Sequence, residues 1–487
     1  MKALIGCDFG GGASKATLLR EDGTILATAT CEYPTSYPYP GWAEQNPDDS
    51  LNACIQNIRR LLQHIDPADV VALALDGATH TAVLLDEKDR VIRPAIYWTD
   101  RRSTEEAAEL ESEYGSLLRE LSYNAPSAFW TLPQLIWLAR HEPESARRIR
   151  KVMSMKDYVR YRFTGDYVTD SIEAMGFLLE DARNGIWDKR LCELCGLKPE
   201  IMPEIVSPMQ ILSPIRAEIC RETGLSPKTL VVAGTTDTCM EVYASGAIAP
   251  GQATVKLATA GRICAITEAP TISPLLVTYR HVVPGLWYPG SATKSAAASF
   301  RWLRDTFRNF SYAALDKLAE DVPAGCEGMF FHPYLQGEIT PYLDDALRAS
   351  FTGVTSRHST GHFARAVLEG VGYSMKACKQ ALDGLNIPVT AASIIGGGAK
   401  SALWRQIVAD MLQIPLIKAR DDDSSLGSAM LAGVSAGVFA DFADSTAKCV
   451  HPEFIVEPNP ANIARYNELF PIYERIHDAL APIYQEL

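Results

Sequence analysis

The sequence lacks a basic excess, a long apolar run and any regular spacing of cysteines. Its formal net charge of −13 argues against a nucleic-acid partner, because such a partner requires a basic surface. No uninterrupted apolar stretch is long enough to span a bilayer, and no basic segment followed by an apolar one opens the chain as in a signal peptide. These absences favour a cytoplasmic protein with neither a membrane nor a nucleic-acid partner.

The 11 cysteines are scattered and odd in number, so they do not indicate a disulfide framework. Cys192 and Cys195 form the single CxxC pair, and a zinc site would need two further ligands nearby in space. No second pair is visible, so two cysteines on one face of a helix are the favoured interpretation.

The length of 487 residues favours two or more domains, and 47% hydrophobic with 22% charged residues is ordinary for a globular protein. In the first half, Asn46 and Pro47 mark the start of a helix that runs to about residue 65. Strands are predicted on either side of it, at residues 3–7, 13–19, 24–30, 70–76, 81–86 and 91–97.

The middle of the chain, roughly 103–225, is predicted to be mostly helical, and a strand returns at 230–233. The second half repeats the order of the first, with strands at 253–268 and 391–395 and helices at 295–308, 360–385, 401–413 and 425–436. The turn-rich segment 244–251 suggests a boundary between two α/β lobes, 1–245 and 246–487.

Three successive glycines, Gly10, Gly11 and Gly12, follow the first strand. Such a turn lets the backbone approach a phosphate closely. Asp8 at the strand end could hold a magnesium ion, and Lys15 could reach a phosphate oxygen. A tight hairpin with a surface aspartate and lysine explains the same residues equally well. The pattern is neither a Walker loop nor a dinucleotide fingerprint.

Asp237 follows the strand 230–233 and a Gly-Thr-Thr turn. A carboxylate at a strand end is well placed to accept a proton from a substrate hydroxyl. Phosphoryl transfer otherwise needs mainly positioning and charge neutralisation. The alternative is that Asp237 caps a helix that begins near Cys239, and one residue could fill both roles.

Gly396, Gly397 and Gly398 connect the strand 391–395 to the next helix. Glycines there leave room for a flat ligand, although a tight strand-to-helix connection explains them as well. The small residues Gly427, Ala429, Ala432 and Gly433 indicate close helix packing.

Two stretches have the composition of a sugar-binding surface. The loop 40–47, Pro-Gly-Trp-Ala-Glu-Gln-Asn-Pro, carries an aromatic and polar side chains. Residues 76–81, Asp-Gly-Ala-Thr-His-Thr, come before a segment 98–102 that reads Trp-Thr-Asp-Arg-Arg. Aromatic faces with carboxylate and imidazole groups suit a polyhydroxylated ligand, although a lone histidine in a strand-rich block is more often structural.

Taken together, these stretches resemble the FGGY family of carbohydrate kinases over nearly the whole chain. The ordered matches are the first glycine turn and the motifs at 40–47, 94–103, 156–158, 163–165, 234–237, 337–341, 396–410 and 425–429. The resemblance implies an actin-like ATPase fold, in which two ribonuclease-H-like lobes close on ATP and a sugar. It also implies magnesium-dependent transfer of the ATP γ-phosphate to a terminal hydroxyl. D-xylulose is the favoured substrate, with ribulose, erythritol and glycerol as alternatives.

The resemblance also assigns roles to residues. Asp237 corresponds to the general base and Asp8 to the magnesium-linked aspartate. The ATP-binding residues are expected to be Gly10, Gly11, Gly12 and Lys15 in the first loop, Thr259 and Gly261 in the second, and Gly397, Gly398 and Lys400 toward the adenosine. Thr79, His80, Trp98 and Asp100 fall where the family binds its sugar, together with Asp237.

Several residues depart from the family pattern. Gly11 stands where the first loop usually has threonine, Ala260 interrupts the second loop, and Ile339 replaces an arginine. The segment 76–81 keeps the histidine of the usual Ser-Gly-Gln-Met-His-Gly and changes its neighbours. A sugar-binding regulator without activity is therefore a second hypothesis, and an actin- or chaperone-type ATPase is a third. Both retained aspartates, Asp8 and Asp237, favour an enzyme. The sequence leaves open whether the chain forms a homodimer.

Overall fold

The computed structural model describes residues 1–308 and 310–487, which divide into two compact units. The first comprises Met1–Ile248, Tyr279–Gly285 and Asp421–His451, and the second comprises Ala249–Thr278, Leu286–Arg420 and Pro452–Leu487. Two segments beyond residue 245 therefore pack with the first unit. Each unit is built around its own mixed β-sheet, which confirms the predicted α/β class.

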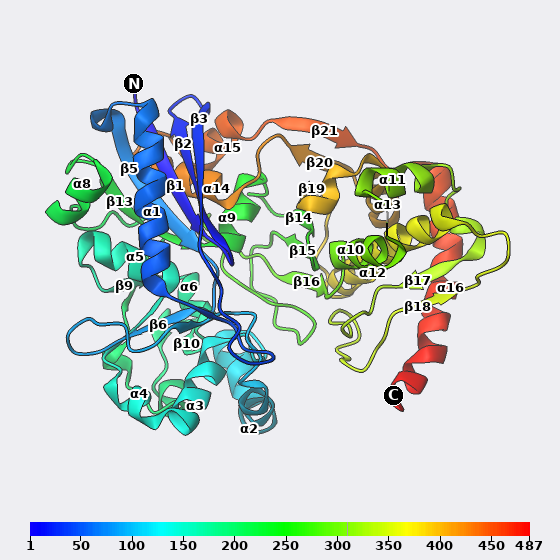
Figure 1. Cartoon of the computed structure of the whole chain (residues 1–487), viewed down its shortest axis with the longest axis horizontal. Helices are drawn as coiled ribbons and strands as arrows, with labels where there is room; N and C mark the ends of the chain where they lie inside the picture. The colour runs from blue at the N-terminus through cyan, green and yellow to red at the C-terminus, as the bar shows by residue number, and fades with distance from the viewer. Residues whose placement is uncertain (309) are drawn as a thin grey trace. The chain divides into compact units, whose positions relative to one another are not determined.

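The sheet of the first unit has the strand order β13-β5-β1-β2-β3 (Figure 1). Its antiparallel part consists of β1 (Ala3–Phe9), β2 (Ala13–Arg20) and β3 (Ile25–Glu32). Two strands, β5 (Val70–Gly77) and β13 (Leu230–Thr236), continue the sheet parallel to β1. The predicted strands in these five places are confirmed.

Helices cover both faces of this sheet. Successive side chains of β1 point to opposite faces, and all of them are buried. Ile5 and Cys7 belong to a buried apolar core with α1 (Pro47–Leu61), which Asn46 caps as predicted. On the other face lies α14 (Ser424–Ser435). A Cβ atom at Gly6 would lie 1.9 Å from the Ser425 carbonyl oxygen, so α14 can approach β1 this closely only over a glycine.

The sheet of the second unit has the strand order β16-β15-β14-β19-β20-β21. Here β14 pairs antiparallel with β15 and parallel with β19, and β20 continues parallel to β19. The order β16-β15-β14-β19-β20 repeats the order β3-β2-β1-β5-β13 of the first sheet with the same strand directions. The bounds are β14 (Gln252–Leu257), β15 (Gly261–Ala265), β16 (Gly290–Thr293), β19 (Ala391–Ile395), β20 (Leu416–Ala419) and β21 (Pro452–Val456).

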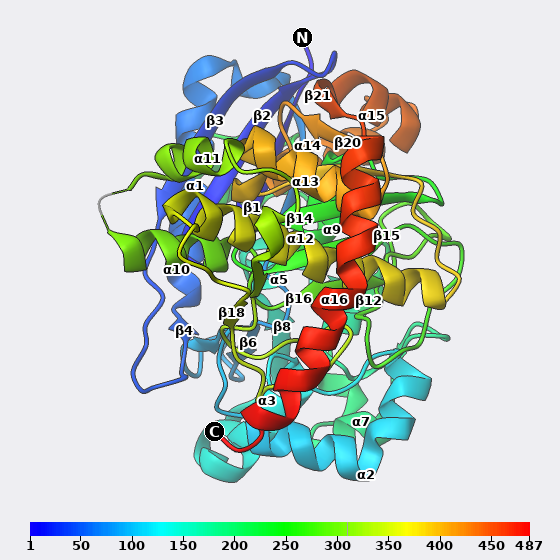
Figure 2. The ribbon, with the colours of Figure 1, turned by 90° about the vertical axis from the view of Figure 1, so that its right-hand side faces the viewer.

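The helices of the second unit surround a buried core against this sheet. The longest are α12 (Thr360–Gly384) and the C-terminal α16 (Pro460–Tyr484), drawn in red in Figure 2. Tyr373 of α12 stacks on Tyr473 of α16 at 4.9 Å between ring centroids. The others are α10 (Ala297–Phe307), α11 (Tyr312–Glu320) and α13 (Ala402–Leu412), and a small hairpin contains β17 (Phe330–His332) and β18 (Ser350–Thr352).

Helices dominate residues 103–225 as predicted, but short strands interrupt them. The helices are α2 (Thr104–Ser122), α3 (Thr131–His141), α4 (Pro143–Arg148), α5 (Met155–Thr164), α6 (Glu173–Gly176), α7 (Lys189–Leu194) and α8 (Ala217–Thr223). The strands are β8 (Lys151–Ser154), β9 (Val168–Asp170), β10 (Glu180–Asp181), β11 (Ile186–Trp187) and β12 (Glu204–Val206). Two further helices of this unit are α9 (Asp237–Ala244) and α15 (Phe442–Cys449).

The predicted strand at 91–97 is wrong in its extent. Only β7 (Ala95–Ile96) forms there, paired with β4 (Glu44–Gln45), because Pro94 has no N–H group with which to continue the ladder. The preceding strand, β6 (Ala82–Leu85), forms as expected.

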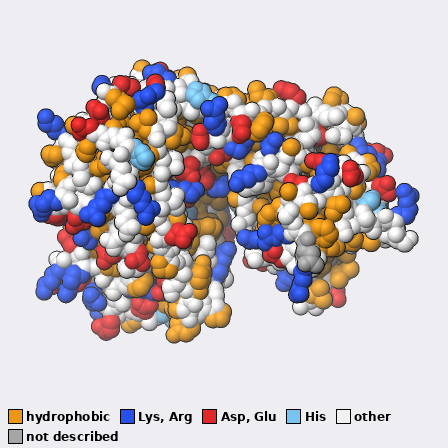
Figure 3. Space-filling view, turned by 45° about the horizontal axis from the view of Figure 1, so that its top comes forward, with side chains coloured by type: hydrophobic (Ala, Val, Ile, Leu, Met, Phe, Trp, Pro, Cys, Tyr) orange, Lys and Arg blue, Asp and Glu red, His pale blue; other side chains and the backbone are white. Residues whose placement is uncertain are grey.

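The charged side chains on the surface are of both signs, as the sequence composition predicts. Basic and acidic side chains are interspersed over the visible face, without a single broad basic patch (Figure 3). No helix within residues 1–308 and 310–487 is long and apolar enough to cross a membrane. Cys192 lies in α7 and Cys195 directly follows it; both are buried, and neither forms a disulfide.

Candidate active site

Three aspartates lie at the carboxyl ends of neighbouring parallel strands in the first unit. Asp8 is near the end of β1, Asp76 is its direct partner in β5, and Asp237 immediately follows β13. The carboxyl ends of parallel strands meet at one edge of a sheet, which is where α/β proteins commonly bind ligands. The structure therefore brings together Asp8, Asp237 and a third carboxylate, Asp76, that sequence reasoning had placed in the sugar-binding segment.

Asp8 and Asp76 are both buried, and their carboxyl groups interact. Burial raises the pKa of Asp8 to about 7, and the charge of Asp237 adds to this effect, while a hydrogen bond from Asp76 opposes it. Burial and the neighbouring Asp8 raise the pKa of Asp76 well above its usual range. The Ser428 hydroxyl donates to Asp76 Oδ2 at 2.5 Å. Without a cation, the pair therefore retains a proton at neutral pH, as close carboxyl groups do.

The residues present fit a magnesium ion. Asp8 Oδ1 and Asp76 Oδ1 are buried oxygens that no N–H or hydroxyl group of the described residues contacts. Magnesium is commonly bound by one or two carboxylates, with water and substrate phosphates as its other ligands. A cage of three or more His, Cys, Asp or Glu side chains is absent from residues 1–308 and 310–487, so the protein offers a partial ligand set of this kind.

Asp237 is the first residue of α9, and it is half-buried. Its Oδ1 atom accepts hydrogen bonds from the backbone N–H of Thr238 at 2.5 Å and from the Thr238 hydroxyl at 3.2 Å. The cap of the helix is Thr236, whose hydroxyl accepts from the Cys239 N–H at 3.3 Å. The alternative in which Asp237 serves as the helix cap is therefore wrong, and the positive end of the helix favours an ionised carboxylate at this position.

The first glycine turn is held through its carbonyl groups. The Tyr33 hydroxyl donates to Gly10 O at 2.7 Å, and the Gln45 amide donates to Gly11 O at 3.1 Å. The Thr35 hydroxyl also donates to Gly11 O. A Cβ atom at Gly12 would meet no other atom within 4 Å, so the tip of the turn is open. Sequence reasoning missed Tyr33 and Thr35, and the only signal for this support was Gln45 in the loop 40–47.

Lys15 makes an ion pair on the strand that follows the turn. Its Nζ atom lies 2.7 Å from Asp423 Oδ2, and both side chains are partly exposed. Burial disfavours the ammonium, but the hydrogen bond and charge of Asp423 outweigh it and keep the pKa of Lys15 above its usual value. The predicted contact between Lys15 and a phosphate stays a prediction that requires this pair to open or to be shared.

His80 lies in an aromatic cluster, and its backbone has a φ of 64°. Its Nδ1 atom lies 2.9 Å from the Gly176 carbonyl oxygen, and its Nε2 atom lies 3.2 Å from the Tyr279 hydroxyl. Because a carbonyl only accepts, Nδ1 carries the proton. The Trp130 ring packs edge-on at 4.5 Å from the imidazole. A left-handed φ at a non-glycine residue costs free energy and is concentrated at functional sites. The neighbouring Thr79 is nearly buried.

Trp98 and Asp100 occupy one loop but differ in exposure. The Trp98 side chain is 41% exposed, as a sugar-stacking ring could be. Asp100 is buried, accepts from the Ala43 N–H at 2.6 Å, and pairs with the Arg102 guanidinium at 2.7 Å. The Oδ2 atom of Asp100 thus holds the loop 40–47 at Ala43, while its Oδ1 atom accepts from the Arg102 backbone N–H at 2.8 Å. Sugar binding by either residue stays a prediction.

The predicted nucleotide residues of the second unit also share one sheet edge. Thr259 and Gly261 form the β14–β15 turn, and Gly397, Gly398 and Lys400 follow β19, the parallel neighbour of β14. A Cβ atom at Gly396 would lie 2.7 Å from the Leu257 carbonyl oxygen, so the two turns touch. Gly397 has open space above it, with no atom within 4 Å of an added Cβ, whereas Gly398 is packed.

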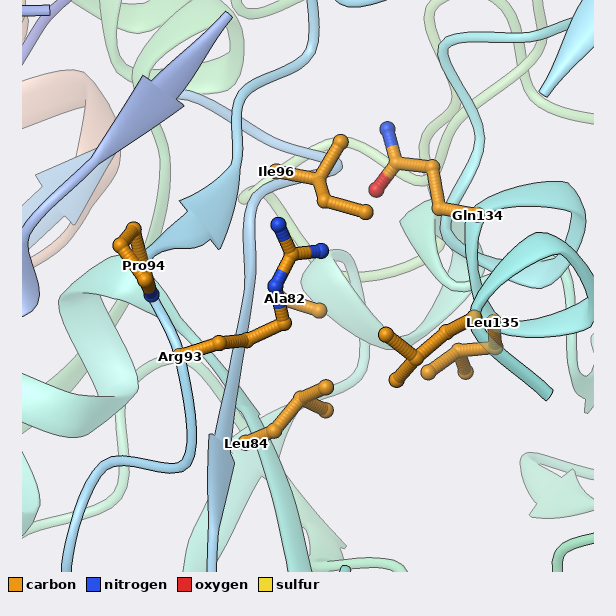
Figure 4. A pocket seen from close by; sticks show the side chains of 8 residues that line it. Ala82, Leu84, Arg93, Pro94, Ile96, Gln134 and Leu135 are labelled. Atoms are coloured by element: carbon orange, nitrogen blue, oxygen red, sulfur yellow. The ribbon is translucent and has the colours of Figure 1, made fainter. Parts of the chain in front are cut away.

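A separate pocket in the first unit lies beside β7 and α3 (Figure 4). Its lining is mostly apolar, with Gln134 and the Arg93 guanidinium as polar groups. Arg93 is engaged in ion pairs with Glu44 and Glu142. None of the residues predicted to bind sugar, metal or nucleotide lines this pocket.

The first unit carries carboxylates at its sheet edge, and the second unit carries glycine turns at its own. This arrangement matches a sugar-kinase fold. The N-terminal domain model of the FGGY family of carbohydrate kinases matches residues 3–243, and the C-terminal domain model matches residues 259–436. The chain belongs to the FGGY family of carbohydrate kinases, and it is an ATP-dependent sugar kinase of that family. The expected two-domain fold is thereby confirmed.

Known relatives cover the whole chain. Xylulose kinase of Escherichia coli (strain K12) is 31% identical over 98% of this chain and 99% of its own length. The structure of ligand-bound xylulose kinase from Lactobacillus acidophilus superposes with a TM-score of 0.95 at 26% identity, covering 100% of both chains. Gluconate kinase from the same organism gives a TM-score of 0.94 at 26% identity, covering 100% of this chain and 99% of its own. Overall similarity alone does not separate these two substrates.

Proposed function

We propose that the protein transfers the γ-phosphate of ATP to the terminal hydroxyl of D-xylulose and forms D-xylulose 5-phosphate. The observation that carries the proposal is the placement of Asp237 beside the Asp8 and Asp76 pair at one sheet edge. A base next to buried oxygen ligands is the arrangement that phosphoryl transfer to an alcohol requires. Xylulose as the acceptor is supported by the xylulose kinases among the similar proteins.

In this proposal Asp237 is the general base. Its carboxylate accepts the proton of the terminal hydroxyl while that oxygen bonds to the γ-phosphorus. The bond from the γ-phosphorus to the β–γ bridging oxygen breaks in the same step, so the products are the sugar phosphate and ADP. The hydrogen bonds from Thr238 fix the carboxylate at the start of α9, which keeps it oriented for this proton.

The other predicted residues bind and position the reactants. Asp8 and Asp76 would hold magnesium, which neutralises phosphate charge when it is bound. Gly10–Gly12 and Thr259–Gly261 would bind phosphates through their backbone, and Gly397 would face the adenosine across the open space above it. Thr79, His80, Trp98 and Asp100 would form or support the sugar site.

Gluconate is a second candidate substrate, because a gluconate kinase matches this chain as well as a xylulose kinase does. The reaction type and the role of Asp237 would be the same. A carboxylate on the substrate would then need a basic partner. Stimulation by gluconate and not by ketoses would favour this candidate.

The test is ADP formation by the purified protein with magnesium and ATP, across D-xylulose, D-ribulose, D-gluconate, erythritol and glycerol. We expect strong stimulation by D-xylulose, and phosphorus NMR of the product should show a primary phosphate ester. Preferential use of another compound would overturn xylulose but keep the kinase. Absence of stimulation by all five, with ATP binding intact, would instead favour the inactive sugar-binding regulator. Sugar-independent hydrolysis would favour the ATPase.

A further inference from the structure

Tyr97 is held rigidly beside the first glycine turn. It follows β7, its backbone N–H donates to Ala43 O at 2.9 Å, and its carbonyl accepts from the Asp100 N–H at 2.9 Å. Its ring is 7% exposed and packs with Ala43 and Ala78. Backbone bonds on both sides of Tyr97 and its buried neighbours therefore restrict where the ring can lie.

The Tyr97 hydroxyl occupies the space that a side chain at position 11 would need. A Cβ atom built on Gly11 would lie 2.7 Å from Tyr97 Oη and 3.3 Å from the ring carbon that bears it. Contacts this short do not occur between a Cβ atom and a rigid neighbour, so Tyr97 and a larger residue at position 11 exclude each other. The threonine hydroxyl that Gly11 lacks is thus replaced, because the Tyr97 hydroxyl lies at the same place.

The Tyr97 phenol is close enough to two carboxylates of the candidate active site for their charges to affect it. Burial raises the pKa of Tyr97, and the charges of Asp237 and Asp8 raise it further. The phenol is therefore protonated throughout the physiological range and is a hydrogen-bond donor. Its side-chain hydrogen-bond partner is the Trp98 indole N–H, which only donates, so among the described residues the phenol proton is available to a ligand.

We propose that the Tyr97 hydroxyl donates a hydrogen bond to the γ-phosphoryl group of ATP, in the role that a side chain at position 11 would otherwise fill. This inference rests on the proposed function of Gly10–Gly12 as a phosphate loop. Phosphoryl oxygens only accept hydrogen bonds, so a protonated phenol over the middle of the turn matches them. Gly11 and Tyr97 would thus act together, the glycine leaving room for the hydroxyl that the tyrosine supplies.

The first test compares binding of the non-hydrolysable ATP analogue AMP-PNP and of ADP, each with magnesium, by calorimetry. Tyr97→Phe should weaken AMP-PNP binding about tenfold or more and change ADP binding by less than about twofold, because one bond to a charged group is lost. Tyr167→Phe is the matched control, since its partly buried hydroxyl donates to Ile201 O at 2.6 Å and not to a group of the turn. It should change neither affinity.

The second test exchanges the two side chains. Gly11→Thr and Tyr97→Ala should each weaken AMP-PNP binding, the first by collision and the second by loss of the donor. Gly11→Thr combined with Tyr97→Ala should bind AMP-PNP more tightly than Tyr97→Ala alone, because the threonine hydroxyl then has room. Thermal unfolding of each variant identifies any loss of fold.

Several results would overturn the inference. They are wild-type affinities in Tyr97→Phe, an equal loss for AMP-PNP and ADP, a change only in the KM of the sugar, or a double variant no better than Tyr97→Ala. Binding is measured without sugar, so failure to phosphorylate any sugar would reject the proposed substrate and leave this test valid. A wild-type protein that binds no nucleotide would overturn both.

Discussion

Asp8 and Asp76 are direct partners on the parallel strands β1 and β5, and burial together with their proximity raises the pKa of both carboxyl groups. Two carboxyl groups in this position are unfavourable unless a proton or a cation compensates them. A divalent ion that binds to these two carboxyl groups would therefore displace a proton from them.

We predict that binding of magnesium and ADP releases protons. The pKa of Asp8 is raised to about 7, so its acid form dominates below pH 7 and binding should weaken as the pH falls. At pH 7 about half a proton or more should be released, which calorimetry in two buffers of different ionisation enthalpy detects. Asp76→Ala removes a donor to Asp8 and should move the dependence to higher pH, whereas Asp76→Asn keeps a donor. Equal heats in both buffers would contradict this proton release.

A second prediction concerns the general base. Asp237→Asn should lower kcat by a factor on the order of 10²–10⁴, because the proton of the hydroxyl loses its acceptor. AMP-PNP binding should remain close to wild type. Removing the Asp237 charge should also lower the pKa of Asp8 and move proton release to lower pH. Asp49→Asn, in the first turn of α1, is the matched control and should leave turnover unchanged. Near-normal turnover in Asp237→Asn would reject the assignment.

A third prediction uses the glycines of the second unit. Gly397→Leu should fold normally, because no atom lies within 4 Å of an added Cβ, and should raise the KM for ATP several-fold by filling that space. Gly384→Leu at the end of α12 has equally open surroundings and serves as the control, with no change in KM. An unchanged KM in Gly397→Leu, together with an unchanged melting temperature, would remove Gly397 from the nucleotide site.

The elements were predictable where the sequence signal is local. Turn residues and alternation placed β1, β2 and β5 within two residues, and the cap at Asn46 placed α1. The strand at 91–97 failed because Pro94 outweighs the apolar run around it. Short strands such as β9 depend on partners distant in the chain, which local patterns do not encode.

The site was predictable to the extent that it consists of motifs. Asp8 and Asp237 were found as strand ends, and the structure places both at one edge. Asp76 was assigned to the sugar segment because the parallel register of β1 and β5 cannot be read from either strand alone. The contact between Gly11 and Tyr97 was missed for the same reason. In the sequence, Gly11 is an isolated departure from the family pattern and Tyr97 is one aromatic residue in a loop.

A final prediction concerns acid stability of the second unit. His332 is buried, and its Nε2 atom lies 3.1 Å from the Tyr473 carbonyl oxygen. Burial lowers its pKa to about 4, so between about pH 6.5 and pH 4 the unfolded state binds one proton more than the folded state. The free energy of unfolding should therefore fall with the pH over this window, by about 3 kcal/mol in total. His332→Gln should reduce this dependence, and the exposed His451→Gln should not, as judged from urea unfolding at pH 7 and pH 5. An identical pH dependence of the free energy of unfolding in His332→Gln and the wild type would show that other groups control stability at acid pH.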